Sequence, residues 1–133
     1  MQENTTGAVS DLSAHLVFVV KYRRRALTAE ILTRCETIIS DTAATLGVTI
    51  IEIKGEADHL HLLIDYPPKH SIATIAGRLK GATAHKLRLE FGAHLSKYLW
   101  GGHLWTDSYF AASTGGASLA TVKRYITNQN RPE

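Results

Sequence analysis

The sequence contains a single cysteine, Cys35, so no disulfide can form within the chain. A fold that depends on disulfides is excluded, and we expect a reducing compartment. No apolar run approaches the roughly 20 residues that a membrane-spanning helix needs. The first residues also lack the basic-then-apolar layout of a signal peptide. We therefore expect a protein of the cytoplasm that does not associate with a membrane.

Neither sign of charge dominates: 15 Lys and Arg stand against 12 Asp and Glu, which gives a net charge of +3. This small excess permits a polyanionic partner without requiring one. The apolar share of 44% and the charged share of 20% are typical of a globular protein. A chain of 133 residues suffices for one domain with a substantial core. We predict a flexible N-terminal tail over 1–11 and a single domain over 12–133.

The spacing of apolar residues predicts six regular elements and then a seventh. Strands are expected over 13–20, 48–54, about 59–66 and 104–113, and helices over about 28–46, 71–90 and 118–130. The first six elements have the order βαββαβ, which is that of a ferredoxin-like α+β sandwich. We expect a four-stranded antiparallel sheet with two helices on one face. The first and third strands would be central neighbours, and the C-terminal helix would be an addition to this fold.

Two histidines stand on one face of the third predicted strand. Residues two apart on a strand share a face, so His59 and His61 point the same way, and Leu60 and Leu62 point the other way. Neutral imidazole is a common metal ligand, and a strand fixes its direction. The pair could therefore form half of a metal site. The alternative is that both are polar residues on the solvent face of the sheet.

The last predicted helix carries two more polar groups on one side. Tyr125 and Gln129 are four residues apart and so project from the same side of a helix. Leu119, Val122 and Ile126 form an apolar stripe that could lay this helix on the open face of the sheet. Tyr125 and Gln129 would then reach the histidine pair. The ordinary alternative is a tyrosine that buries its ring and a glutamine at the surface.

Together these groups suit the cleavage of a phosphodiester. His59, His61 and the amide oxygen of Gln129 would hold a divalent cation that polarises the scissile phosphate. Tyr125 would attack the phosphorus, because a phenol is a modest nucleophile and also a fair leaving group. The phosphotyrosine bond keeps the energy of the phosphodiester, so a free 3′-hydroxyl can later rejoin the strand. A flexible joint at Gly115–Gly116 precedes the helix.

Basic residues gather after the first predicted strand and along the second predicted helix. Arginine binds phosphate in a bidentate manner, and a basic helix face suits a nucleic-acid backbone. The alternative for both groups is a solvated surface. The residues that we predict to contact DNA are Lys21, Arg23, Arg24, Arg25, Arg78, Lys80 and Lys86.

Four stretches carry a family resemblance: His15 to Arg24, Asp58 to Ile64, Leu104 to Phe110 with Gly115–Gly116, and Val122 to Ile126. With the His-Leu-His triplet and the late Tyr125-x-x-x-Gln129 pattern, the chain resembles the HUH-type single-tyrosine transposases (TnpA) of small bacterial and archaeal insertion sequences. The resemblance extends over nearly the whole chain. It implies an enzyme that excises and inserts a DNA element as a single strand.

The resemblance has further implications for partners and site residues. The family recognises hairpins near the ends of the element, requires Mg²⁺ or Mn²⁺, and works as a homodimer in which the tyrosine helix of one subunit can complete the site of the other. The metal ligands would be His59, His61 and Gln129, and Tyr125 would form a 5′-phosphotyrosine intermediate. Gly115–Gly116 would be the hinge on which the tyrosine helix swings. Such an enzyme would act at the nucleoid.

Other interpretations remain open. A non-catalytic RNA-recognition module has the same topology, but its third strand should carry aromatic residues where this chain has His-Leu-His-Leu-Leu. A domesticated relative that processes palindromic repeats, or an initiator nuclease of replication, would use the same chemistry. His15 could support the metal ligands, although we expect a core histidine whose ring is bonded to the backbone.

Overall fold

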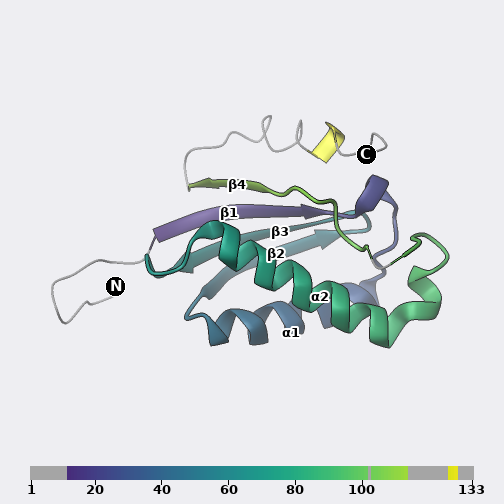
Figure 1. Cartoon of the computed structure of the whole chain (residues 1–133), viewed down its shortest axis with the longest axis horizontal. Coiled ribbons are helices and arrows are strands. Elements are labelled where there is room, and N and C mark those ends of the chain that lie inside the picture. Colours follow the sequence, from purple (N-terminus) through teal and green to yellow (C-terminus); the bar gives the residue numbers. More distant parts are fainter. Residues whose placement is uncertain (1–11, 102, 114–125, 129–133) are drawn as a thin grey trace, which may run out of the picture.

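The structure, a computed structural model, describes residues 12–101, 103–113 and 126–128. Its elements are β1 (Leu12–Val19), the 3₁₀ turn η1 (Lys21–Arg23), α1 (Ala29–Thr45), β2 (Thr49–Glu56), β3 (His59–Tyr66), α2 (Ile72–Leu95) and β4 (Phe110–Ser113). The strands form one antiparallel sheet in the order β2-β3-β1-β4. Both helices cover the same face of it (Figure 1). The predicted ferredoxin-like sandwich, with β1 and β3 in the centre, is confirmed.

Local sequence signals explain where α1 begins and how closely it packs. The hydroxyl oxygen of Thr28 accepts a hydrogen bond from the backbone N–H of Ile31 at 3.2 Å, which caps the first turn. After the helix, Gly47 adopts φ +70°, a conformation that favours glycine. At Gly55 of β2, a Cβ atom would lie 2.5 Å from Cδ2 of Leu32. The absence of a side chain there lets α1 lie close to the sheet.

The main core lies between the sheet and the two helices. On β3, Leu60, Leu62 and Ile64 are each 0% exposed, and Leu16 and Phe18 of β1 are buried with them. Burying side chains of this size stabilises the fold by about 1.5–3 kcal/mol each. The alternating side chains of the same strands therefore lie on the face that carries neither α1 nor α2.

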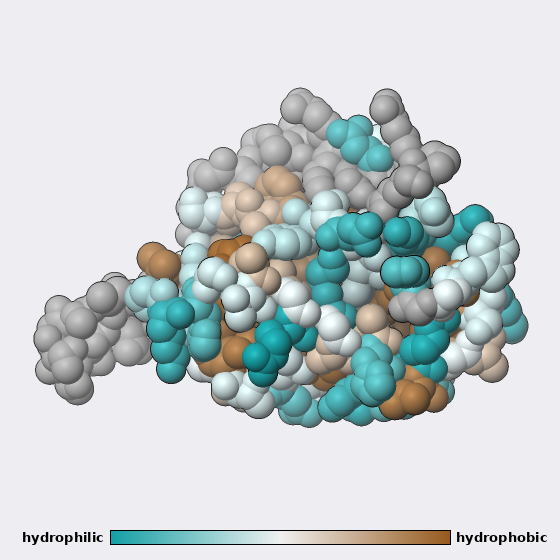
Figure 2. Space-filling view, in the orientation of Figure 1, coloured by the Kyte–Doolittle hydropathy of each residue, from teal (hydrophilic) through white to brown (hydrophobic). Residues whose placement is uncertain are grey.

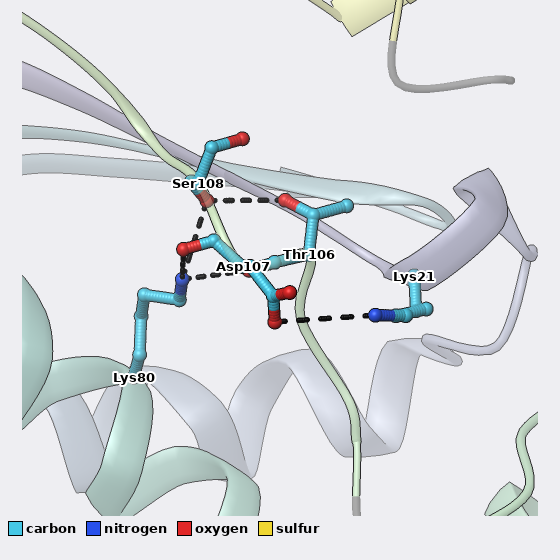
Figure 3. Close-up of polar contacts among 5 residues, drawn as sticks. All are labelled: Lys21, Lys80, Thr106, Asp107 and Ser108. Carbon is cyan, nitrogen blue, oxygen red and sulfur yellow. Dashed lines mark hydrogen bonds and ion pairs between the residues drawn. The ribbon is translucent and has the colours of Figure 1, made fainter. Parts of the chain in front are cut away.

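The fourth strand is shorter than predicted. We expected it over 104–113, but β4 covers only Phe110–Ser113. Before it, the ammonium of Lys80 donates hydrogen bonds to the carbonyls of Thr106, Asp107 and Ser108 at 2.7, 3.3 and 3.2 Å (Figure 3). Just before these carbonyls, Trp105 forms an isolated antiparallel bridge with Val20, and the backbone N–H of Thr106 donates to the carbonyl of Val19 at 2.8 Å. The predicted strand is therefore interrupted where the carbonyls accept from Lys80, and it resumes as β4 at Phe110.

Helix α2 is longer than predicted. It continues to Leu95, beyond the expected end near Glu90, and Phe91 has non-helical angles (φ −127°, ψ 27°). The predicted end thus falls next to an irregular position inside the helix. No helix in the described ranges is long and apolar enough to cross a membrane.

The predicted tail over 1–11 lies outside the described residues, as does most of the C-terminal helix predicted over about 118–130. Residues 126–128 are described, and they are helical.

Candidate functional site

The two histidines of β3 share the face of the sheet opposite α1 and α2, as predicted. His59 and His61 are both partly buried, and they alternate with fully buried leucines. On the neighbouring strand β1, Val19 is the partner of His59 and Val17 is the partner of His61. Because β3 is a central strand, the backbone that carries the pair is hydrogen-bonded on both sides. The two imidazoles are therefore presented from a rigid support.

A buried carboxylate holds His59. The Nδ1 atom of His59 lies 2.9 Å from Oδ1 of Asp58, whose Oδ2 accepts a hydrogen bond from Nε of Arg23 at 2.9 Å. Asp58 is only 5% exposed, and this burial opposes ionisation. The hydrogen bonds from His59 and Arg23 outweigh that effect, so the pKa of the Asp58 carboxyl is lowered. An ionised Asp58 accepts from Nδ1–H of His59, which leaves the lone pair on Nε2 available for a ligand.

A strained turn brings Arg23 to this carboxylate. Tyr22 and Arg23 adopt φ values of +59° and +55°, in the left-handed region that side chains other than glycine rarely occupy. Such a conformation costs on the order of 1–3 kcal/mol per residue and persists only where the surroundings impose it. Here the backbone N–H of Arg23 donates to the carbonyl of Val20 at 2.7 Å, and its side chain donates to Asp58. The turn thus positions the guanidinium of Arg23 against the carboxylate that contacts His59.

His61 has a different partner. Its Nε2 atom lies 3.0 Å from Nδ1 of His15 on β1, and the two ring planes are within 6° of parallel. Burial lowers the pKa of His61, and the charge of a protonated His15 would lower it further. His61 is therefore mainly neutral near neutral pH, the state in which imidazole binds a metal. Our expectation that the His15 ring is bonded to the backbone was wrong, since it contacts the side chain of His61.

The donor set fits a divalent cation in part. Neutral imidazoles suit such cations, and the Asp58 contact leaves one nitrogen of His59 ready. Ligation through Nε2 of His61 would require that atom to exchange His15 for the cation. Among residues 12–101, 103–113 and 126–128, no group of three His, Cys, Asp or Glu side chains could hold a metal ion. The histidine pair therefore needs a donor of another kind, and an amide oxygen such as that of Gln129 is one.

The remaining catalytic predictions lie outside the described residues. These are the nucleophile Tyr125, the ligand Gln129 and the hinge Gly115–Gly116. The three residues between Tyr125 and Gln129 are helical, in agreement with the predicted C-terminal helix. The roles of these residues stay predictions.

The basic residues that we predicted to contact DNA fall into two groups, those with partners inside the protein and those exposed to solvent. Three have partners within the protein: Arg23 on Asp58, Lys80 on three carbonyls, and Lys21, whose ammonium lies 3.9 Å from Asp107 (Figure 3). These contacts favour structural roles. The other four side chains are exposed, namely Arg24, Arg25, Arg78 and Lys86. In the view of Figure 2, hydrophilic residues are mixed with small, separate hydrophobic patches.

Sequence reasoning missed the role of Asp58. In the sequence, Asp58 stood out only as the first residue of the stretch from Asp58 to Ile64 that carries the family resemblance. The available signal was an acidic residue directly before the His-x-His triplet. Neighbours on a strand point to opposite faces, which argues against contact, but Asp58 precedes β3 and is not bound by that alternation.

The chain is similar in sequence to known proteins. Residues 8–129 match the family described as IS200-like transposase. The ISDra2 transposase TnpA of Deinococcus radiodurans is 34% identical over 127 residues, which cover 96% of this chain and 90% of that protein. The transposase for insertion sequence element IS200 of Salmonella typhimurium is 34% identical over 115 residues, covering 86% of this chain and 74% of that protein.

Solved structures give the same result. A crystal structure from Deinococcus radiodurans R1, assigned as a transposase, has a TM-score of 0.86 and 32% identity, and the match covers 97% of this chain and 98% of that one. The structure of a REP-associated tyrosine transposase bound to a REP hairpin has a TM-score of 0.60 and 11% identity, over 95% of this chain and 68% of that one, and supports the fold alone. The match along almost the whole sequence and the shared fold lead to one conclusion: the chain belongs to the IS200-like transposase family.

Proposed function

We propose that this transposase cuts and rejoins single-stranded DNA at the hairpin-marked ends of an insertion sequence, through a 5′-phosphotyrosine intermediate. The observation that supports this most is that His59 and His61 lie side by side on the face of the sheet opposite α1 and α2 (Figure 1). His59 has its Nδ1 atom held by a buried carboxylate, and His61 has a lowered pKa. Two histidines with no role beyond solubility would not require a buried Asp58 behind them.

His59, His61 and Gln129 are the proposed ligands of a divalent cation, Mg²⁺ or Mn²⁺, which when bound polarises the scissile phosphate and favours departure of the leaving oxygen. The phenolic oxygen of Tyr125 attacks the phosphorus, a new O–P bond forms, and the bond from phosphorus to the 3′-oxygen breaks. The phenolic proton is lost and the departing 3′-oxygen gains one. In the reverse step, the 3′-hydroxyl of a new strand attacks the phosphotyrosine and releases Tyr125.

The proposed DNA contacts rest on exposed positive charge. Arg24 and Arg25 follow η1, near the end of β1 where His59 is paired, while Arg78 and Lys86 lie on α2. We propose that the DNA includes a hairpin; the REP-associated tyrosine transposase, which shares the fold, is itself bound to a REP hairpin. We further propose a homodimer, a swing of the C-terminal helix about Gly115–Gly116, and action at the nucleoid.

The decisive test is a covalent adduct. The full-length protein is incubated with Mn²⁺ and single-stranded oligonucleotides that carry the palindromes flanking its gene, and the denatured products are separated by size. A shifted protein band is expected. Tyr125→Phe should abolish the band and keep hairpin binding, because only the nucleophilic oxygen is lost. His59→Ala should lose cleavage, and the control Tyr66→Phe should retain it.

The same assay separates the alternatives. Hairpin binding without an adduct, with folded protein and metal present, would contradict the nuclease proposal and indicate a non-catalytic binding module. Adduct formation without strand transfer to a second oligonucleotide would favour a relative that only processes palindromic repeats. Cleavage by Tyr125→Phe would show that the nucleophile is a different residue.

A further inference from the structure

A pocket of about 160 Å³ lies between η1 and the loop that follows α2. Both segments lie at the end of the sheet where β1 ends (Figure 1). Aromatic rings from Tyr22, Tyr98 and Trp100 line it together with the cationic side chains of Lys21 and Arg24. No carboxylate is among the described residues that line it. The ammonium of Lys21 lies 3.9 Å from Asp107, so the exposed Arg24 supplies most of the positive charge of the pocket. The pocket therefore combines flat apolar surface with positive charge.

Trp100 is the unusual member of this pocket. It is 81% exposed, whereas the other tryptophan, Trp105, is 5% exposed in the core and donates its indole N–H to Thr83 at 2.8 Å. Proteins that bind single-stranded nucleic acids often have exposed aromatic residues beside cationic ones. The bases stack on the aromatic rings, and the cations attract the phosphates. Lysine is depleted at protein–protein interfaces, whereas this pocket has Lys21 beside its aromatic rings. The cationic lining thus favours a nucleotide as the occupant.

The size of the pocket indicates which kind of base fits it. A protein cavity of about 150 Å³ accepts a benzene molecule, which is a single six-membered ring. The pocket next to Trp100 is close to this size, although it opens to solvent. A pyrimidine base is also a single six-membered ring, so it fits better than a two-ring purine.

We propose that this pocket binds one unpaired pyrimidine of the single-stranded DNA, with the base stacked on Trp100 and the adjoining phosphate held by Arg24. The proposal rests on the proposed function in one respect, that the substrate strand is single-stranded near the site. No sequence-specific hydrogen bond is required, since stacking tolerates different bases of one size.

The pocket lies next to the turn that supports His59, so a base bound there would help to position the DNA strand. Tyr22 and Arg24 flank Arg23, whose side chain donates to Asp58, and Asp58 holds His59. One short turn therefore contributes both to the support of a metal ligand and to the base pocket. A base held there would fix the strand close to the histidine pair and limit which phosphodiester reaches it.

The test measures binding without cleavage. Full-length protein is titrated with a short oligothymidylate in EDTA, and tryptophan fluorescence and oligonucleotide anisotropy are followed together. Oligothymidylate should quench the wild-type fluorescence through Trp100. Trp100→Ala should lose that quenching and bind about tenfold more weakly, and Trp100→Phe should recover most of the affinity. An abasic oligomer should bind wild type and Trp100→Ala equally, and oligoadenylate should bind wild type more weakly than oligothymidylate.

Leu89→Ala is the matched control, because Leu89 is 73% exposed, is apolar and does not line the pocket. It should bind oligothymidylate as the wild type does. Equal affinity of wild type and Trp100→Ala would overturn the proposal. So would a change in oligomeric state by gel filtration with no change in DNA affinity, which would mark the surface as a protein interface. The covalent adduct does not enter this measurement, so its absence in the wild type would contradict the nuclease proposal and leave the pocket standing.

Discussion

The two faces of β3 arise from one strand but have different surroundings. On one face, Leu60, Leu62 and Ile64 are fully buried beneath the helices. On the other face, His59 and His61 are partly buried and contact the polar side chains of Asp58 and His15. The comparison indicates that the strand anchors the polar groups through its apolar face. Stability and chemistry should therefore depend on different residues that are adjacent in the sequence.

The largest expected effect on stability comes from the apolar face. Leu62→Ala should lower the free energy of unfolding by about 2–5 kcal/mol, because it removes buried contacts and leaves a cavity. The neighbouring His61→Gln should lower it by less than about 1 kcal/mol, because Gln keeps a polar group on the face opposite α1 and α2, while adduct formation is lost. Urea unfolding of both variants, followed by circular dichroism, makes the comparison. Equal losses of stability would show that the two faces are not separable.

The alternation that distinguishes these faces was predictable because it is local. The alternation of His59, Leu60, His61 and Leu62 predicts a strand with one apolar face and one face that carries the histidines, and the structure has both. The segment 106–108, which interrupts the fourth predicted strand after the Trp105–Val20 bridge, was not predictable in this way. Its carbonyls bind Lys80, which is 26 to 28 residues away in the sequence, and apolar spacing contains no signal for such a contact.

In the candidate site, too, contacts between residues far apart in the sequence could not be predicted from local spacing. The histidine pair follows from spacing within three residues. The contact of His61 with His15 spans 46 positions and depends on the register between β1 and β3. Arg23 was predicted to bind DNA from its charge and from its place in a basic run at the end of a strand, but the left-handed turn that directs it to Asp58 is not visible in the sequence. Charge identifies a candidate residue, while the backbone decides which partner it meets.

The second prediction tests whether Asp58 supports His59 as a metal ligand. Asp58→Asn should weaken Mn²⁺ binding by about 10–100-fold, because the neutral amide no longer fixes His59 with a charged acceptor. Isothermal titration of the purified variants with Mn²⁺ measures this loss. Asp41→Asn is the control, since Asp41 is exposed on α1, and it should bind Mn²⁺ as the wild type does. If the two variants behave alike, Asp58 does not support a metal ligand.

The smallest expected effect concerns the segment that leads into β4, at the edge of the sheet. Lys80→Met should lower the free energy of unfolding by about 1 kcal/mol, because three carbonyls lose a charged donor but two of them belong to exposed residues and can bind water. Hydrogen exchange should quicken over 104–113 and remain unchanged in the central strands. Lys86→Met, on the exposed side of the same helix, should alter neither quantity.

The same two variants decide between structural and DNA-binding roles for lysines on α2. If Lys86 contacts a phosphate, Lys86→Met should reduce the salt dependence of oligonucleotide binding by about one unit of slope. Lys80→Met should leave that slope unchanged, because its ammonium already binds the protein backbone. An equal reduction by both would show that Lys80 exchanges its carbonyl partners for phosphate. In that case binding of DNA would release the segment before β4, and the edge of the sheet would respond to the substrate.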